Sequence, residues 1–274
     1  MSDRVLAAER RRLLARQLVR DGGIKVGQTA RRFGVSTETI RKDLIHLQEQ
    51  GLAHKSHGGA IPTGDLIERP TAVKGTENPR AKSELARTAR ELIPDRAILL
   101  LDAGSTTHAL AELLAELQDL TIFTNSVPVL TALAPSPNKV FCFGGELRGT
   151  SLALAGGWAV DALRSIRVDL AFLGTDGCRG LSGPSSASYE EAQFKTEVVR
   201  ASNRTVVLGD HSKFAQTGLF QFCSWDEVYA LVTDTGATAA DMQAIGERTR
   251  VITGRPGFGT EGPEPLPGAS PRVG

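Results

Sequence analysis

The first sixty residues carry the apolar pattern of three short helices. Apolar side chains recur at helical spacing over 6–20, 27–33 and 37–50, and glycine follows each segment. We expect Gly34 to take the tight turn before the third helix and Ser36 to cap its N-terminus. The stretch 52–62, with paired glycines, predicts a small β-hairpin. Together these elements predict a winged helix-turn-helix.

From residue 80 the pattern changes to short apolar runs that alternate with helical segments. Helical patterns cover 80–93, 105–117, 188–201 and 238–248. The apolar runs lie at 97–101, 120–124, 139–143, 168–174, 205–209, 228–233 and 250–253. Buried strands that alternate with helices predict an α/β domain with a largely parallel sheet.

These patterns divide the chain into four parts. We predict a winged helix-turn-helix domain at 1–62, a linker at 63–79, an α/β domain at 80–253 and a tail at 254–274. The linker is rich in Pro, Gly, Thr and charge. The tail has six glycines, five prolines and almost no large apolar side chains, so we expect it to be disordered.

Composition and charge narrow the class of protein. The 274 residues are 41% hydrophobic and 23% charged, which is typical of a soluble globular chain. We see no apolar run of membrane-spanning length and no secretory signal, and three widely spaced cysteines indicate reduced thiols in a cytoplasm. Residues 1–60 hold twelve Lys or Arg and six Asp or Glu, a net charge of +6, whereas the rest of the chain carries −5. This asymmetry fits either a nucleic-acid-binding unit or a charged surface without a partner.

The third helix, taken with the elements around it, decides between these two interpretations. One face carries Ile40, Leu44 and Leu47, which we expect to pack on the other two helices. The remaining positions carry side chains that can hydrogen-bond base edges: Glu38, Thr39, Arg41, Lys42 and His46. An isolated helix of this kind is usually a solvated surface helix. The turn, the hairpin and the positive charge lie within the same sixty residues, so we predict DNA binding.

In the second domain, the segment 102–107 (Asp-Ala-Gly-Ser-Thr-Thr) ends an apolar strand and opens a helix. Free backbone N–H groups, a glycine and three hydroxyls make a site for an anion. The alternative is a capped helix start without a ligand. The motif GxxxxGKS or GxxxxGKT is absent, so we do not expect nucleotide hydrolysis.

Polar side chains also follow four other apolar runs. They are Thr124-Asn125, Gly144-Gly145 with Arg148, Gly174 to Gly177 with Asp176, and Asp210 to Lys213. Ligands bind beyond the carboxyl ends of the strands in an open parallel sheet, so we expect these groups to converge on one cleft. Glu191 and Lys195 share a helix face at i and i+4, which is also the spacing of a simple surface ion pair.

The N-terminal residues resemble a known family. Val35 to Leu44, Gly51-Leu52 and His57 to Ala60 are similar to the DNA-binding signature of the DeoR family of bacterial regulators. The resemblance implies that the operator is contacted by Ser36, Thr37, Thr39, Arg41 and Lys42, and its backbone by Lys55 and His57 from the wing. Lys42 and Lys55 stand where arginine is commoner; they keep the charge but lose the bidentate fork.

The resemblance extends over about 80–253. It implies a sensing domain similar in fold to ribose-5-phosphate isomerase and the coenzyme A transferases, with phosphorylated sugars or related metabolites as effectors. Asp95-Arg96 departs from the Asp-Gly that the family usually has before the first strand. The predicted effector-binding residues are Asp102, Gly104, Ser105, Thr106, Thr107, Asn125, Gly145, Arg148, Asp176, Glu191, Lys195, Asp210 and Lys213.

We therefore predict a cytoplasmic, homo-oligomeric transcription regulator, usually a repressor in this family, that binds double-stranded operator DNA and responds to a phosphorylated sugar. The alternative is an enzyme similar to a sugar-phosphate isomerase, in which Asp102, Glu191 or Lys195 transfers protons and the N-terminal unit is an accessory. We predict no membrane partner, no cofactor and no metal, since the histidines of the first sixty residues lack Cys or carboxylate partners at ligand spacing.

Overall fold

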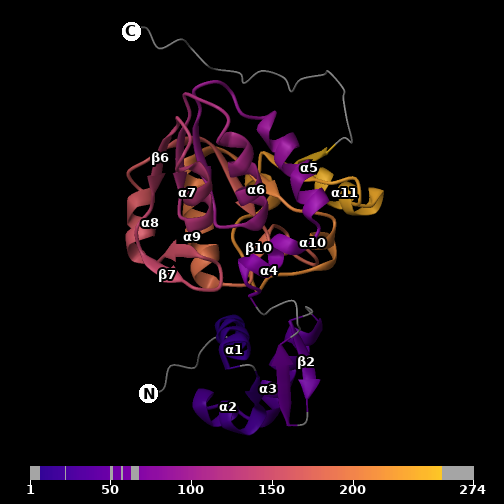
Figure 1. Ribbon diagram of the computed structural model, residues 1–274. Helices are drawn as coiled ribbons and strands as arrows, with labels where there is room; N and C mark the ends of the chain where they lie inside the picture. The colour runs from indigo at the N-terminus through magenta and orange to yellow at the C-terminus, as the bar shows by residue number, and fades with distance from the viewer. Residues whose placement is uncertain (1–6, 22, 50–51, 57, 63–67, 255–274) are drawn as a thin grey trace.

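The computed structural model describes residues 7–21, 23–49, 52–56, 58–62 and 68–254. They form a small N-terminal unit, the head (7–62), and a larger α/β unit, the body (68–254), shown in Figure 1. The predicted wing residue His57 lies outside the described residues. So does the predicted tail, apart from Gly254.

The described head consists of three helices and a three-stranded antiparallel sheet. Its elements are α1 (Ala7–Asp21), β1 (Ile24–Lys25), α2 (Val26–Phe33), α3 (Thr37–Glu49), β2 (Ala53–Ser56) and β3 (Gly59–Pro62), with strand order β1-β3-β2. Gly34 ends α2 with a φ of 62°, a conformation that favours glycine. At the start of α3 the Ser36 hydroxyl accepts a hydrogen bond from the Thr39 N–H at 3.1 Å. The predicted winged helix-turn-helix fold is confirmed.

Packing in the head fixes which side of α3 faces outward. Ile40, Leu44 and Leu47 are buried in one cluster with Leu14 and Leu18 of α1. A buried carboxylate adds a polar anchor on the same side, because Asp43 of α3 accepts hydrogen bonds from Arg10 (2.6 Å) and Arg11 (3.1 Å) of α1. The polar side of α3 is therefore left to the solvent.

The body is built on a seven-stranded sheet whose neighbouring strands all pair in parallel. The strands are β4 (Ile98–Leu101), β5 (Thr121–Thr124), β6 (Lys139–Cys142), β9 (Val168–Gly174), β11 (Ser202–Leu208), β13 (Ala230–Thr233) and β14 (Arg250–Thr253). Their order is β14-β13-β11-β9-β4-β5-β6. The chain builds outward from β4 first in one direction and then in the other. The switch point of the topology therefore lies between β4 and β9, where ligands of such sheets bind.

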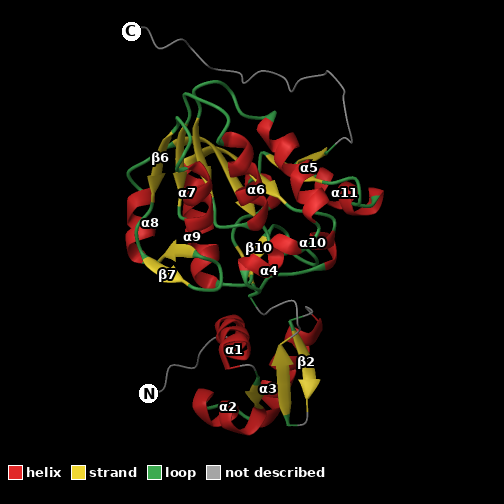
Figure 2. Cartoon of the chain, viewed as in Figure 1, coloured by secondary structure: helices red, strands yellow, loops and turns green. Residues whose placement is uncertain are grey.

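Helices cover both faces of this sheet (Figure 2). One face carries α5 (Pro79–Arg90), α6 (Ser105–Leu114) and α7 (Val127–Leu133), and the other carries α8 (Gly157–Leu163), α9 (Tyr189–Ala201) and α11 (Ala239–Gly246). Successive strand residues face opposite layers: Leu99 and Leu101 lie in the first core, and Leu100 lies in the second. The predicted α/β architecture is confirmed.

Shorter elements surround the carboxyl ends of the strands, and the sequence patterns did not predict them. They are α4 (Thr71–Thr76), the pair β7 (Glu146–Arg148) and β8 (Ala153–Ala155), the pair β10 (Ser185–Ser186) and β12 (Phe220–Gln221), and α10 (Ser212–Ala215). A 3₁₀ helix (Trp225–Glu227), also not predicted, directly precedes β13. Helix α4 lies within 63–79, the segment predicted to be a linker, and part of that segment therefore packs on the body near α6. No helix among the described residues is both long and apolar enough to cross a membrane.

Candidate functional site

The outward side of α3 presents hydrogen-bonding and cationic side chains to the solvent. Ser36, Thr37, Arg41 and Lys42 are exposed, and Thr39 is half-buried. The Arg41 side chain is 61% exposed and pairs with Glu38, one turn earlier, at 3.4 Å. Such a pair is weak in water, so the guanidinium is free to exchange Glu38 for a base edge or a phosphate.

The wing adds a second exposed cation to the head. Lys55 lies in β2, opposite Ala60 of β3, and its side chain is exposed along with those of His54 and Ser56. A backbone hydrogen bond from the Val26 N–H to the Gly58 carbonyl (3.0 Å) ties the tip of the wing to α2. The predicted DNA-contacting residues that the structure describes are thus all at least partly accessible.

In the body a small cavity lies at the switch point, beyond the carboxyl ends of β4, β9 and β11. Its volume is about 40 Å³, the space of a few water molecules. The lining residues are polar or charged with few exceptions: Lys74, Glu77, Asn78, Lys82, Ala103, Gly104, Ser105, Thr106, Gly174, Thr175, Asp176, Glu191, Lys195, Leu208, Asp210, Ser212 and Lys213. Four lysines and four acidic residues therefore surround this space.

A buried ion pair between Asp102, just after β4, and Lys195 of α9 lies beneath the cavity. The Lys195 ammonium lies 3.1 Å from the Asp102 carboxylate, and both side chains are almost completely buried. Asp102 also accepts hydrogen bonds from the Gly174 N–H (2.9 Å) and the Thr107 hydroxyl (2.9 Å). Burial alone lowers the pKa of Lys195, but Asp102, Glu191 and Asp176 outweigh it and raise that pKa above its ordinary value. Lys195 is thus held in its charged form.

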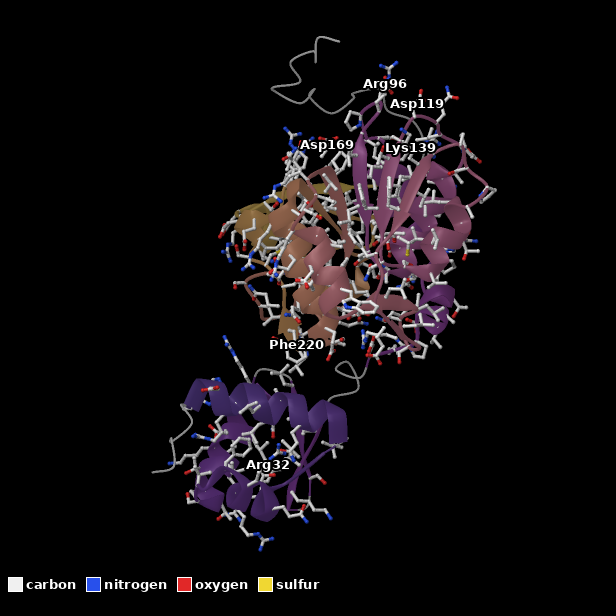
Figure 3. The ribbon with its side chains drawn as sticks, turned by 90° about the vertical axis from the view of Figure 1, so that its left-hand side faces the viewer. Arg32, Arg96, Asp119, Lys139, Asp169 and Phe220 are labelled. Carbon is white, nitrogen blue, oxygen red and sulfur yellow. The ribbon has the colours of Figure 1, made fainter. Side chains whose placement is uncertain are left out.

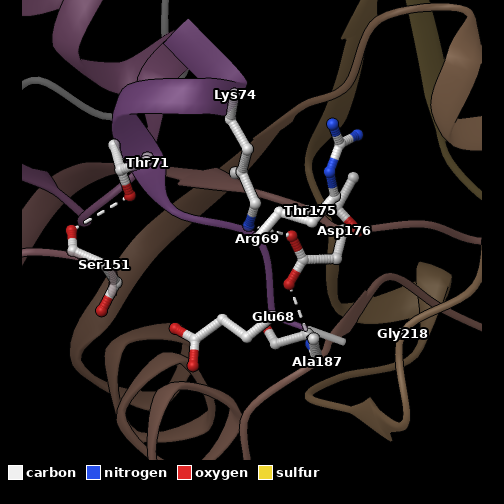
Figure 4. A network of polar contacts seen from close by, with 12 residues as sticks. Glu68, Arg69, Thr71, Lys74, Ser151, Thr175, Asp176, Ala187 and Gly218 are labelled. Atoms are coloured by element: carbon white, nitrogen blue, oxygen red, sulfur yellow. Dashed lines mark hydrogen bonds and ion pairs between the residues drawn. The ribbon is translucent and has the colours of Figure 1, made fainter. Parts of the chain in front are cut away.

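A second ion pair closes the cavity from the side of α4 (Figure 4). The Lys74 ammonium lies 2.6 Å from one oxygen of Asp176, and the other oxygen accepts the Ala187 N–H at 2.8 Å. Burial raises the pKa of Asp176, but Lys74, Lys195 and these hydrogen bonds outweigh it and bring the pKa to about 2. Figure 4 also shows the Thr71 hydroxyl donating to the Ser151 carbonyl, which holds α4 against the hairpin β7–β8.

A third charged group joins the same segment to α9. Arg148 of β7 lies 2.9 Å from Glu191 and also pairs with Glu68, just before α4. Burial raises the pKa of Glu191 to about 7, and the nearby carboxylates of Asp176 and Glu68 add to the rise, while Lys195 opposes it. The charge of Glu191 therefore changes near neutral pH.

The remaining cations line the cavity from α5 and α10. The Lys82 ammonium donates to the backbone carbonyls of Lys74 and Glu77, and burial lowers its pKa. Asp210 accepts hydrogen bonds from Asn78 (3.1 Å) and from Ser212, next to Lys213. Among the described residues, no group of three or more His, Cys, Asp or Glu side chains could hold a metal ion.

Comparison with known proteins places both units in one family. The model of the DeoR-like helix-turn-helix domain matches residues 10–63, and that of the DeoR C-terminal sensor domain matches residues 77–235. The chain belongs to the DeoR family. Relatives of this regulator span nearly its whole length. The HTH-type transcriptional regulator GlpR of Haloferax volcanii is 32% identical, covering 87% of this chain and 94% of the relative.

Two further relatives are named as repressors. The transcriptional repressor AccR of Agrobacterium fabrum is 31% identical, with 85% of this chain and 92% of the relative covered. The glycerol-3-phosphate regulon repressor of Escherichia coli K12 is 29% identical, with 84% and 92% covered. Among solved structures, ribose-5-phosphate isomerase A of Methanocaldococcus jannaschii matches with a TM-score of 0.38 and 20% identity, covering 50% of this chain and 55% of that one.

Eight of the thirteen effector-binding residues predicted for this DeoR-family regulator line the cavity: Gly104, Ser105, Thr106, Asp176, Glu191, Lys195, Asp210 and Lys213. Two others lie beneath it. The Thr107 hydroxyl is fully buried and holds the turn together, because it donates toward Asp102 and accepts from the Gly104 N–H. Asp102 is enclosed by its partners. Neither side chain faces the cavity, so both have a supporting role here.

The other three predicted residues lie near the hairpin β7–β8, away from the cavity lining. The Asn125 amide donates to the Leu154 carbonyl at 3.1 Å. Gly145 has a φ of 145°, and a Cβ there would lie 2.3 Å from the Ala155 carbonyl oxygen, so this glycine is needed for close backbone packing. Arg148 reaches the site only through its ion pair with Glu191. These three residues support the structure around the hairpin β7–β8 and do not line the cavity.

The sequence patterns missed Lys74 and Lys82. Both precede the first strand of the sheet, one in the predicted linker and the other in α5. No strand ends beside them in the chain, so the rule that located the other site residues does not reach them. The one sign of such a residue in the nearby sequence was the charge of the predicted linker, which contains Lys74.

This regulator also has contacts between its two units. Leu219 of the body packs against the apolar cluster of the head, and the adjacent Phe220 lies at the end of the body nearest the head (Figure 3). A groove between the units is lined by Arg12 and Leu47 of the head and by Gln193 and Glu197 of α9. Helix α9 therefore borders the cavity with one side and the head with another.

Proposed function

We propose that this regulator is a repressor whose hold on operator DNA is controlled by a phosphorylated sugar, or a related small phosphate ester, bound in the cavity of the body. The observation that carries the proposal is the cavity itself. It lies at the switch point of the sheet, it opens onto the N-terminus of α6, and four lysines surround it. Two relatives named as repressors support this interpretation, and one of them is a repressor of a glycerol-3-phosphate regulon.

The operator is read by α3 and held by the wing. Arg41 and Lys42 contact base edges or phosphates in the major groove, with Ser36, Thr37 and Thr39 at the N-terminal end of the helix. Lys55 and His57 approach the backbone from the wing. A protein of this kind acts on chromosomal DNA, which places it in the cytoplasm.

The effector phosphate binds at Gly104, Ser105 and Thr106, where backbone N–H groups and the helix dipole favour an anion. Lys82 and Lys213 neutralise its charge, and Asp176 and Asp210 bind sugar hydroxyls. A cavity of about 40 Å³ is too small for a sugar phosphate, so side chains must move when it binds. Lys74 is the cation most easily drawn away, because its ion pair with Asp176 competes directly with the ligand.

Two connections carry the effect to the head. Helix α4, with Lys74, lies in the segment that joins the two units, and α9 borders both the cavity and the head. Movement of either element shifts the position of the head. Effector binding in the cavity is thereby coupled to operator binding by the head. The regulator works as a homo-oligomer, because one recognition helix reads too few base pairs to select one site in a genome.

We propose no catalytic activity for the body. An isomerase needs a carboxylate or amine that is free to move a substrate proton. Both oxygens of Asp102 are already engaged by Lys195, Gly174 and Thr107. Incubation with sugar phosphates should therefore yield no product; turnover that depended on Asp102, Glu191 or Lys195 would contradict this part of the proposal.

The test is a pair of substitutions, one in each unit of the full-length protein. An operator is first selected from a random duplex pool, and its release is then assayed with a panel of sugar phosphates and glycerol 3-phosphate. Arg41→Ala should lose discrimination between this operator and a scrambled duplex by about 5- to 150-fold, the effect of one base contact worth about 1–3 kcal/mol. It should keep the rise in melting temperature that the effector produces.

Thr106→Asp should behave in the opposite way. The added negative charge excludes a phosphate from the N-terminus of α6, so operator binding should persist and the effector should no longer release it. The unphosphorylated sugar serves as the ligand control. A Thr106→Asp protein that responded to the phosphorylated ligand like the wild type would contradict the proposed phosphate site, and an Arg41→Ala protein with full operator preference would contradict the proposed reading of DNA.

A further inference from the structure

The outer edge of β6 carries unpaired backbone groups. β6 is the last strand on its side of the sheet, and no described strand pairs with its outer edge. The Lys139 N–H donates to the Leu120 carbonyl (3.0 Å), and the Phe143 N–H donates to the Thr124 carbonyl (2.8 Å), so the odd-numbered residues direct their backbone groups toward β5. Backbone direction alternates along a strand. The N–H and C=O groups of Val140 and Cys142 therefore point away from the sheet.

Large apolar side chains are exposed along the same side of the body. Phe141 of β6 is 50% exposed and stacks on Phe123 with ring centroids 4.9 Å apart. Leu147 of β7 and Trp158 of α8 are 54% and 80% exposed. β6, β7 and α8 lie together on one side of the molecule in Figure 1, the side that Figure 3 turns toward the viewer. Exposed aromatic side chains beside an open strand edge mark a surface that another protein covers.

We propose that this edge is the interface with a second copy of the chain. The two β6 strands pair antiparallel about a two-fold axis that passes beside Phe141, and they join two seven-stranded sheets into one. This inference rests on the proposed function, because a regulator that reads a repeated operator needs a second head. It adds the location of the interface and the register of the contact.

The backbone groups of β6 are arranged to pair with themselves. A two-fold axis perpendicular to the sheet leaves each face on the same side in both copies, so opposite residues must share a face. With Phe141 opposite itself, Val140 of each copy lies opposite Cys142 of the other. These are the two residues whose backbone groups point outward, so each pair exchanges two hydrogen bonds. The Phe141 pair is then the close, non-hydrogen-bonded one, which suits two aromatic rings.

The charges near the edge also fit a second copy. In this register Lys139 of one copy lies opposite Phe143 of the other, a short distance along the chain from the exposed Glu146. The opposite edge of the sheet differs in its exposure: after the exposed Arg250, the other three residues of β14 are only partly exposed. β6 has no proline and no charge beyond Lys139 to prevent edge-to-edge pairing.

The proposal is tested by disulfide cross-linking of the full-length protein. In a Cys142→Ser background, Phe141→Cys places two thiols opposite each other at a non-hydrogen-bonded position, within the Cα separation that a disulfide spans. We expect most of the protein to form a covalent dimer on mild oxidation. The matched control is Val140→Cys in the same background, which lies diagonally from its own copy at about 7–8 Å and should not cross-link. Cys178 and Cys223 are buried and remain reduced in both variants.

A second measurement removes the contact. Phe141→Glu brings two like charges together at the axis and should weaken dimerisation by at least about 30-fold, as loss of an interface hot spot does. Light scattering should then show monomers at concentrations at which the wild type is dimeric. The variant should still show the melting-temperature shift with the effector, because Phe141 lies outside the cavity.

Three results would overturn the proposed interface: no cross-link at position 141, a cross-link at position 140 instead, or a Phe141→Glu protein that associates like the wild type. None of them bears on operator binding or on effector release by the wild-type protein, which are measured separately. A failure of the interface can therefore be told from a failure of the proposed function.

Discussion

The recognition helix and the effector cavity both depend on charged side chains, but the two regions hold them in opposite ways. Arg41 in the head is 61% exposed and has Glu38 as a weak surface partner at 3.4 Å. Lys195 in the body is 8% exposed and lies 3.1 Å from a carboxylate that is 1% exposed. The phosphates of DNA supply the negative charges that pair with exposed cations such as this one. A small ligand instead enters a space in which every charge already has a partner.

This difference has consequences for stability and for function. An exposed cation contributes little to folding, so it is free to serve binding alone. A buried ion pair must stay matched, and a ligand that enters has to exchange one partner for another. Among the described residues of the head, Asp43 and the arginines of α1 form a buried pairing, which fixes α3 without taking part in its outward face. The charged groups that are buried and paired are thus the ones that hold a surface element in place or respond to a ligand.

The largest expected effect comes from breaking the buried pair in the body. Lys195→Met leaves the Asp102 carboxylate buried without its cation, and such a change costs about 3–5 kcal/mol in the free energy of unfolding. Arg41→Ala should change that free energy by no more than about 0.5 kcal/mol, although it removes a charge of the same sign. The measurement is denaturant unfolding, with the transition of the body followed through the buried Trp225.

The comparison fails if the two variants lose similar stability. It would also fail if Lys195→Met unfolded like the wild type, because Asp102 would then not depend on its partner. Arg200→Ala provides a control within α9, since Arg200 is exposed and pairs with Glu197 one turn away. It should behave like Arg41→Ala, which would show that burial, and not the choice of unit, makes the difference.

The two regions also differ in how far the sequence predicts them. The outward face of α3 follows from helical periodicity alone, since Ile40, Leu44 and Leu47 had to point inward and do so. The sheet of the body was predicted in the same way, because each apolar run that was singled out forms a strand. Asp95-Arg96 shows the limit of predicting a turn from the preference for glycine. Arg96 takes a φ of 57° in a turn where glycine would carry no strain.

The cavity could be predicted only in part. Residues that follow strands, such as Asp176 and Asp210, meet there because strand ends of a parallel sheet share an edge. Lys74 reaches Asp176 across 102 positions of the sequence, and no periodicity encodes that contact. Thr107 illustrates a different limit. A hydroxyl at a helix start can face a ligand or hold its own turn, and only the packed structure shows that it bonds to Asp102.

A smaller effect is expected from Glu191, a cavity carboxyl whose pKa is raised to about 7. Burial raises the pKa of Glu191 from 4.5 to about 7, so the folded protein binds more protons than the unfolded chain between these values. The free energy of unfolding should therefore fall as pH rises through this window, by up to about 3 kcal/mol from this group. Glu191→Gln cannot ionise, and its stability should be flatter than that of the wild type from pH 5 to pH 8.

The measurement for Glu191 is chemical denaturation at each pH for both proteins. Other groups titrate in the same range, but they are common to the two proteins and cancel in the difference between the curves. Parallel curves would show that Glu191 is already ionised at pH 5. In that case its ion pair with Arg148 would outweigh the effect of burial.

The smallest expected effect concerns the contact that joins the two regions. Leu219 follows the cavity residues of α10 in the chain and packs on the apolar cluster of the head, so we expect it to transmit part of the response. Leu219→Ser should leave operator affinity without effector, and effector affinity without DNA, within about twofold of the wild type. The factor by which the effector weakens operator binding should fall, by a part of the 1–3 kcal/mol that couplings of about 5- to 150-fold represent. Leu219→Met keeps the apolar contact and should restore the wild-type factor.

The coupling is obtained by titrating operator at fixed effector concentrations and effector at fixed operator concentrations, and the two must agree, because linkage between binding sites is reciprocal. If Leu219→Ser retains the full factor, the signal does not pass through this contact. The segment that carries Lys74 and helix α9 would then be the remaining connections between cavity and head.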